Sequence, residues 1–273
     1  MRAERSRLGS VRVRPARLVL VEPTGIDVAP DGSLLVVESG LRRLVRVNPA
    51  TGRLTPLVDL VKPWGVARAA TGSSYVSDLG WVKRVDPGRA PQIVATVDPG
   101  VEVGPLTVTP AGDVVYSTVS AVYRLAHGTS GAPERLAGGT PFLGPHGIAV
   151  SADGSLLVSD TGNGLIRRIG AAGSVTTFAA IGSPRGIDVA PDGSVYVAGG
   201  DEHRIVHLDA SGKRLGTVGP RFGTPTRSRW RGTGPSTRST SAQMSSAACR
   251  PTERRPSSAG AELWPPVDHR QPL

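Results

Sequence analysis

A unit of about forty residues recurs five times in this chain of 273 residues, and it constrains the fold more than any other feature. Each unit opens on a Pro-x-Gly step or a remnant of one, continues through a short apolar stretch and reaches a glycine at a turn. These turn glycines, spaced 39 to 42 residues apart, are Gly32, Gly72, Gly112, Gly154 and Gly193. Repeats of this length are typical of propellers and solenoids, in which each unit buries its apolar faces against its neighbours.

The pattern inside one unit indicates four short strands. In the first unit, residues 26–29 and 34–37 flank the pair Asp31-Gly32, which predicts a type I′ hairpin turn with positive φ at both central residues. Residues 43–47, Arg-Leu-Val-Arg-Val, indicate a third strand, and a fourth apolar stretch follows another turn. Four antiparallel strands in forty residues predict a propeller blade. We expect inner strands near residues 26–29, 66–69, 106–109, 148–151 and 187–190.

The net charge of +10 lies at the two ends of the chain. Residues 1–17 contain six arginines and one glutamate, and residues 224–273 contain eight arginines and three acids. The 18 basic and 18 acidic residues between these ends balance. The repeated body therefore lacks the charge of a phosphate-binding face, and we expect no nucleic-acid partner.

Cysteine content and hydropathy bear on the compartment. The single cysteine, Cys249, lies outside the repeats, so the body has no disulfide framework and no thiolate zinc site. No apolar run approaches the ~20 residues of a membrane span. Near the N-terminus the longest apolar stretch is 18–21, shorter than the roughly 7–15 residues of a secretory signal core. As written, the sequence favours a cytoplasmic monomer; a start codon assigned too late would hide an export signal.

The first, fourth and fifth units share the pattern Pro-x-Gly-Ile-x-Val, an Asp-Gly turn and a return strand. Residues 160–169, Asp-Thr-Gly-Asn-Gly-Leu-Ile-Arg-Arg-Ile, resemble the Asp-x-x-Asn-x-x-Ile segment of NHL-repeat propellers, and so do residues 201–213. The resemblance covers residues 20–220 approximately and implies an incomplete six-bladed propeller with five recognisable blades. It implies no particular activity, because propellers carry many unrelated functions.

The Pro-x-Gly steps supply the candidate binding residues. In a propeller the first strand of each blade lines the central channel, so the variable residue of each step is expected at one mouth of it. These residues are Thr24, Trp64, His146 and Arg185, with Leu106 nearest the equivalent place in the third unit. Together they would form a polar and aromatic pocket for a protein or small-molecule ligand. The alternative is that they only satisfy loop carbonyls or cap the channel.

The calcium- or zinc-dependent lactonases similar to senescence marker protein 30 are a related family, in which the matching steps supply Asn and Asp to the metal. Here those steps hold His146 and Arg185. An arginine is cationic and has no acceptor, so it cannot ligate a metal ion. Glu22 is a weak candidate for that family's N-terminal glutamate. We expect no metal and no other cofactor.

Virginiamycin B lyases and amidating lyases are further NHL-like enzymes, and both rely on histidines. The histidines of this chain are His127, His146, His203, His207 and His269, and they show no metal-binding spacing. His146 is the one candidate general base. A lactone hydrolase or a lyase is therefore the alternative to a binding scaffold.

Three other residues have structural interpretations. Asp78 and Asp160 end the second strand of their units, where a carboxylate commonly bonds the amides of a tight turn. Trp81 stands where the family places a residue that packs between blades, so we expect it in the core.

The segment 224–273 differs in composition from the body, since 21 of its 50 residues are Ser, Thr or Pro. This composition predicts disorder, as we also expect for residues 1–17, leaving 18–223 as the propeller. A sixth unit is nevertheless due here. Reading the third base of each codon with the first two of the next, from Thr226 to Gly260, permits two Asp-Gly turns between strand-like runs. We therefore hypothesise that this segment is a frameshifted translation of a sixth blade.

Overall fold

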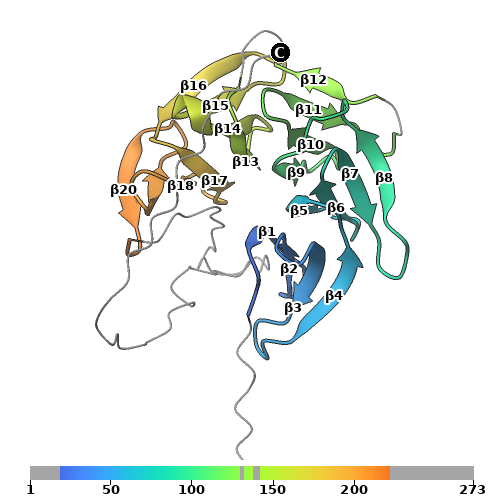
Figure 1. The fold of residues 1–273 in the computed structure, drawn as a ribbon. Helices are drawn as coiled ribbons and strands as arrows, with labels where there is room; N and C mark the ends of the chain where they lie inside the picture. The colour runs from blue at the N-terminus through green and yellow to red at the C-terminus, as the bar shows by residue number, and fades with distance from the viewer. Residues whose placement is uncertain (1–18, 130–131, 138–141, 222–273) are drawn as a thin grey trace, which may run out of the picture.

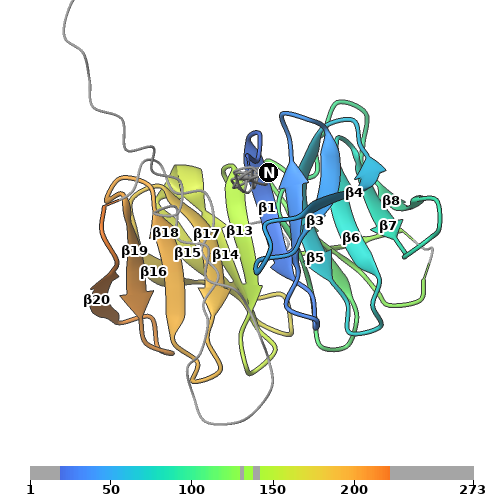
Figure 2. The same cartoon turned by 90° about the horizontal axis from the view of Figure 1, so that it is seen from below.

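The structure is a computed structural model that describes residues 19–129, 132–137 and 142–221. These residues form five four-stranded antiparallel sheets, each a meander of strands consecutive in sequence. The sheets are arranged as blades around a central axis (Figure 1), and their strands run between two opposite faces of the molecule (Figure 2). Within the described residues, the helical structure is one 3-10 turn at Thr161–Asn163. The expected all-β propeller is confirmed.

Blade 1 contains β1 (Pro23–Val28), β2 (Leu34–Glu38), β3 (Arg43–Val47) and β4 (Leu54–Asp59). Blade 2 contains β5 (Pro63–Arg68), β6 (Ser74–Asp78), β7 (Trp81–Val85) and β8 (Gln92–Thr96). Blade 3 contains β9 (Leu106–Val108), β10 (Val114–Ser117), β11 (Val122–Leu125) and β12 (Glu134–Leu136). Blade 4 contains β13 (Pro145–Val150), β14 (Leu156–Asp160), β15 (Leu165–Ile169) and β16 (Val175–Ala180). Blade 5 contains β17 (Pro184–Val189), β18 (Val195–Gly199), β19 (Arg204–Leu208) and β20 (Arg214–Val218).

The described blades form an open ring. The inner strand β1 contacts β5, β5 contacts β9, β9 contacts β13, and β13 contacts β17. An open sector separates blade 5 from blade 1 (Figure 1). The six-blade count that the resemblance implies is therefore corrected to five for the described residues. The segments 1–17 and 224–273, with the expectations of disorder and of a frameshift, lie outside them.

The face of blade 5 that points away from blade 4 is less buried than the equivalent face of blade 1, which packs on blade 2. Tyr196 and Ile205 are half-buried, whereas Leu35 and Leu44 at the equivalent positions are fully buried against blade 2. The Tyr196 ring is stacked on the ring of His207, with centroids 4.5 Å apart. Blade 5 therefore ends the described stack with a partly exposed, partly apolar face.

The inner strands β1, β5, β13 and β17 begin three residues earlier than the sequence suggested, whereas β9 begins at Leu106 as expected. β1 starts at Pro23 because the whole Pro-x-Gly step belongs to the strand, with a register irregularity between Pro23 and Gly25. Proline is tolerated at the first position of a strand, where no ladder N–H is needed. A Cβ on Gly25 would lie 2.9 Å from the Cα of Gly65 in the next inner strand. Glycine therefore lets neighbouring inner strands approach closely around the channel.

The Asp-Gly turn is also of a different type from the one predicted. Gly32 has a φ of 79°, but Asp31 is not among the residues with positive φ, so the turn is not type I′. Ala29 and Ser33 close a three-residue loop, in which Pro30 fixes a negative φ and the glycine takes the left-handed position. The Asp31 carboxylate accepts bonds from the Oγ and the N–H of Ser33, which lower its pKa.

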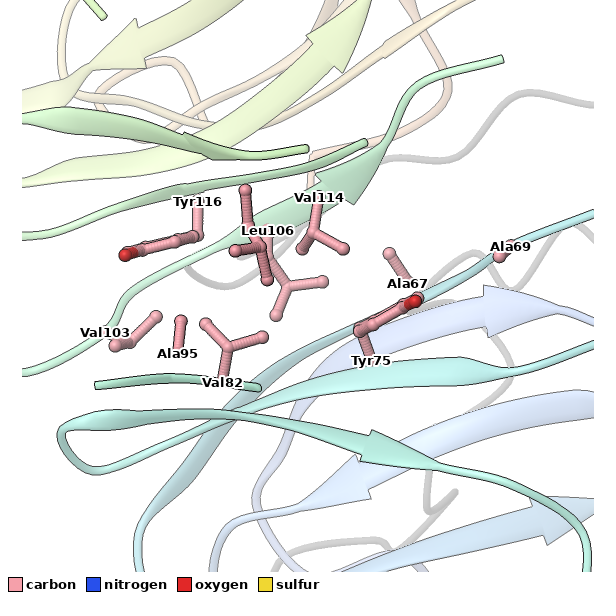
Figure 3. Close-up of a cluster of buried hydrophobic side chains, with 10 residues drawn as sticks. Ala67, Ala69, Tyr75, Val82, Ala95, Val103, Leu106, Val114 and Tyr116 are labelled. Carbon is pink, nitrogen blue, oxygen red and sulfur yellow. The ribbon is translucent and has the colours of Figure 1, made fainter. Parts of the chain in front are cut away.

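The apolar core lies between the blades. Between blades 2 and 3, Tyr75 and Val82 pack against Leu106, Val114 and Tyr116 (Figure 3). Full burial of a valine or leucine side chain stabilises a fold by about 1.5–3 kcal/mol. Each blade therefore depends on its neighbours for the burial of its faces, as the repeat predicts.

Candidate functional site

The four predicted residues line one cavity at the end of the channel where the inner strands begin, which we call the entry mouth. Thr24, Trp64, His146 and Arg185 are each the second residue of an inner strand, in blades 1, 2, 4 and 5. Leu106, the first residue of β9, lines the same cavity from blade 3. The cavity volume is about 60 Å³. This entry cavity has room for a few water molecules or one small polar group, whereas sites for whole small-molecule ligands measure roughly 300–1,000 Å³.

His146 is held in one tautomer at this cavity. Its Nδ1 lies 2.8 Å from the carbonyl oxygen of Gly144, which can only accept, so Nδ1 carries the proton and Nε2 is an acceptor. Burial lowers the pKa of His146, and the charge of Arg185 adds to that effect, against the bond to Gly144. The imidazole is therefore neutral at pH 7. The indole of Trp64 meets it edge to face at 5.6 Å between centroids.

Two polar atoms at the cavity lack hydrogen-bond partners among the residues that the structure describes. These are Thr24 Oγ1 and Arg185 Nε, and both atoms are buried. The ion pairs of the described residues do not include Arg185. A buried polar atom without a partner costs about 1–3 kcal/mol. Both atoms are enclosed, so an incoming acceptor would reach them only after the side chains turn toward the cavity, and the new bond would then remove this cost.

Large apolar side chains stand exposed around the same mouth, in its loops and at the beginning of the inner strands. Their exposed fractions lie between 38% and 64%. This set, which we call the apolar rim, comprises Val21, Leu41, Val61, Trp64, Val119 and Leu143. In each blade, the connection from the second to the third strand lies at this end of the molecule, and so does the connection from the fourth strand to the next blade. The rim residues therefore surround the same mouth.

Three fully buried acids hold rim residues in place, and the first, Glu38, accepts a hydrogen bond from the backbone N–H of Val21 (3.0 Å). Asp78 accepts hydrogen bonds from the backbone N–H groups of Val61 (2.8 Å) and Lys62 (2.6 Å). Asp160 accepts one from the N–H of Leu143 (2.8 Å). Each acid also forms an ion pair with a basic residue on the third strand of its own blade. Asp78 and Asp160 therefore bond backbone amides, as expected, but these amides lie 16 or 17 residues earlier in the chain and not in a tight turn beside each acid.

The rim was not recognised from the sequence, although a signal was present. Val21, Val61 and Leu143 each stand two residues before the proline of a Pro-x-Gly step. A single exposed valine or leucine is unremarkable. Only their common offset from the repeat shows that they gather at one mouth.

Glu22 is not part of this arrangement. It is exposed, with a φ of 48°, and its backbone oxygen accepts bonds from the N–H and Oγ of Ser39. It does not line the entry cavity. No group of three or more histidine, cysteine or acidic side chains in the described part of the chain is placed to hold a metal ion.

Other residues singled out from the sequence lie elsewhere. Trp81 is half-buried on β7, and the Nζ of Lys83 lies 5.3 Å from its ring, so its expected place in the core is corrected to a cation–π contact at the surface of the blade. His203 has a φ of 52°, and its buried Nδ1 has no hydrogen-bond partner in the described part of the chain. His207 stacks on Tyr196. Among the described residues, no helix is long and apolar enough to span a membrane.

A larger cavity of about 400 Å³ lies where the inner strands end, at the opposite mouth. Asp27, Arg68, Thr109, His127 and Asp188 are among its lining residues. Asp27 Oδ2 accepts a hydrogen bond of 2.7 Å from the backbone N–H of Arg68, which ties blade 1 to blade 2. This carboxylate therefore has a structural task, and nothing in the sequence had indicated a cavity here.

Comparison with known proteins agrees with this geometry. The sequence pattern of the NHL repeat matches residues 142–169. Blade 4 carries an NHL repeat. The match covers β13 to β15 and includes His146 and Asp160. No curated protein matches the chain in sequence.

Several solved structures share the fold. A gluconolactonase from Xanthomonas campestris, XC5397, has a TM-score of 0.67 at 21% identity, over 76% of this chain and 79% of that one. A catalytically inactive virginiamycin B lyase from Staphylococcus aureus, with quinupristin, has a TM-score of 0.61 at 19% identity, over 75% and 70%. A chain of a nidogen–laminin complex has a TM-score of 0.64 at 16% identity, over 72% and 80%. At these identities the likeness concerns the propeller fold alone.

Proposed function

We propose that this protein is a binding scaffold whose entry mouth docks a protein partner. The observation that carries the proposal is the combination of a small polar cavity with a broad apolar rim. When a partner covers the rim, burial of its apolar side chains stabilises the complex by roughly 25 cal/mol per Å² of apolar surface. The cavity of about 60 Å³ is too small to enclose a ligand but can receive one side chain of a larger partner.

The buried acids support a role for the rim beyond loop closure. Because Asp78 and Asp160 fix the backbone of Val61 and Leu143, these side chains are presented in a defined arrangement without being buried. A pre-ordered apolar surface loses little conformational entropy on binding. The nidogen–laminin complex is one case in which a chain of this fold occurs in a protein–protein complex.

Site-specific photo-crosslinking tests the proposal. A crosslinking residue at Leu143 in the apolar rim should trap a partner from the source cells, and one at the exposed Ala111 of the opposite mouth should not. The trapped protein, once purified, should bind the unmodified chain, and Val61→Asp should weaken that binding at least about tenfold by placing a charge in an apolar interface. Equal trapping from both mouths, or binding insensitive to Val61→Asp, would contradict the proposal.

A second candidate is a lyase or lactone hydrolase with His146 as general base. The neutral imidazole with its Nε2 acceptor at the cavity favours this candidate. The virginiamycin B lyase among the similar folds was solved as a catalytically inactive histidine variant. The cavity volume and the lack of acidic lining residues weigh against it. Turnover of quinupristin or of a gluconolactone that disappears in His146→Ala would establish this activity.

A further inference from the structure

We propose that the entry cavity is a receptor for one carboxylate group, which the docking partner inserts between Arg185 and Thr24. The inference rests on the proposed binding function and names the chemistry that the mouth recognises. The carboxylate would come from an acidic side chain or from a chain terminus of the partner, since both present the same group.

The charge of the cavity favours an anion. Arg185 is the only charged residue at pH 7 among the residues that line it, and no acid lines it. The buried acids at this end of the blades already have basic partners: Glu38 pairs with Arg43, Asp78 with Lys83 and Asp160 with Arg167. Arg185 has no ion pair among the described residues. A guanidinium in a partly buried site binds a carboxylate through strong charge-assisted hydrogen bonds.

The unpartnered polar atoms reinforce this choice. Arg185 on β17 and Thr24 on β1 both line the cavity, and a carboxylate has two oxygens, one for each donor once the two side chains turn toward it. Each bond would satisfy a group that has no partner within residues 19–129, 132–137 and 142–221. The gain is larger than for an exposed donor, because desolvation of these groups has already occurred on folding.

The size and surroundings of the cavity limit the anion. A volume of about 60 Å³ accepts a carboxylate, and the single cation matches a single negative charge. The ring of Trp64 and the side chains of Leu106 and Ile148 make the remaining wall apolar. The group that enters is therefore a carboxylate on a short apolar stem, with apolar neighbours that meet the rim.

The test uses three synthetic peptides with the full-length chain, and binding is measured by calorimetry and by the NMR signal of the Arg185 Nε–H. The first is a Leu-Glu-Leu peptide blocked at both ends, the second replaces Glu by Gln, and the third is an acetylated Leu-Leu peptide with a free C-terminal carboxylate. Binding of the first or the third, but not of the Gln peptide, is expected. Which of the two binds more tightly identifies the source of the carboxylate.

Two arginine variants provide the matched comparison. Arg185→Gln should weaken binding of the preferred acidic peptide at least about tenfold, as expected for loss of a charge-assisted bond. Arg53→Gln, an exposed arginine in the β3–β4 turn at the opposite end, removes the same charge and should leave the affinity within about twofold. Thr24→Val should weaken binding less than Arg185→Gln, since it removes one neutral donor.

Equal affinity for the Glu and Gln peptides, or acidic-peptide binding that survives Arg185→Gln, would overturn the carboxylate receptor. So would the absence of any Arg185-dependent response at peptide concentrations of about 10 mM, where even weak contacts are populated. Partner trapping at Leu143 would still succeed in those cases if the scaffold function holds, so the two proposals fail separately. Thermal unfolding of each variant excludes loss of the fold as the cause.

Discussion

Removing the carboxylate of Asp78 tests whether buried acids organise the entry mouth. The side chain is fully buried and accepts hydrogen bonds from the N–H groups of Val61 and Lys62. It also pairs with Lys83 at 2.6 Å, whose side chain is only 15% exposed. Asp78→Ala therefore removes the acceptor for two loop amides and leaves a mostly buried ammonium without its counter-charge.

Breaking a buried ion pair by deleting one partner costs about 3–5 kcal/mol. The partial exposure of Lys83 lets its ammonium reach water, and the loop amides are only part-buried, so the lower end applies. We expect a loss of about 3 kcal/mol, which for a domain of this size lowers the Tm by about 6–12 °C. The same variant should weaken partner binding through disorder of the β4–β5 loop.

The matched control is Glu134→Ala, which removes an exposed ion pair with Arg124. The Glu134 side chain is 59% exposed and that of Arg124 is 42% exposed. Exposed pairs contribute about 0–1 kcal/mol, so this variant should unfold almost as the parent does. Urea unfolding followed by circular dichroism measures both variants. Equal stability of the two, or a cost below about 1 kcal/mol for Asp78→Ala, would refute the claim that this acid fixes the loop.

Three further predictions follow from the mouth and from the open ring. Binding of the acidic peptide should strengthen as the pH falls from 7 to 5.5. Burial lowers the pKa of His146 in the free protein, so the imidazole is neutral at pH 7. A bound anion raises that pKa, so the imidazole takes up a proton on binding, and a lower pH favours this uptake. A flat profile, or one that persists in His146→Phe, would contradict this prediction. Dialysis against a chelator should leave the Tm unchanged, because Arg185 occupies a step where the lactonases carry a metal ligand; stoichiometric calcium or zinc that is lost on Glu22→Gln would show the opposite. Resequencing of the gene around the codons for Phe222 to Thr226 should reveal a base inserted or deleted there, and confirmation of the DNA as written, together with a stable monomer, would reject the frameshift.

The repeat predicted the blades because hydrogen-bonded strands and interblade burial impose the same apolar pattern in every unit. The residues of the Pro-x-Gly steps, such as His146 and Arg185, could be grouped because equivalent positions in a propeller meet around one axis. The type of the first hairpin turn was wrong, since the loop has three residues, 30–32, of which only Gly32 takes a positive φ, and the Asp-Gly pair alone does not fix the loop length. Trp81 was placed in the core, but the burial of a side chain on an outer strand depends on its neighbours in space.

The apolar rim and the second cavity were missed for another reason. Val61, Val119 and Leu143 come from three different blades, and each looks like an isolated loop residue along the chain. Their common surface arises only when the blades are placed around the axis. Ring closure is likewise a property of all the blades together, so the sequence of one unit does not determine it.

Hydrogen–deuterium exchange on the complex with the partner trapped through Leu143 tests the central claim most directly. Partner binding should slow exchange in the loops 39–42, 60–62, 118–121 and 142–144, which surround the entry mouth, and at the start of β17 beside Arg185. The hairpin loops at the opposite mouth, 69–73 and 109–113, should exchange at unchanged rates. Protection confined to the opposite mouth, with the entry loops unaffected, would contradict the account.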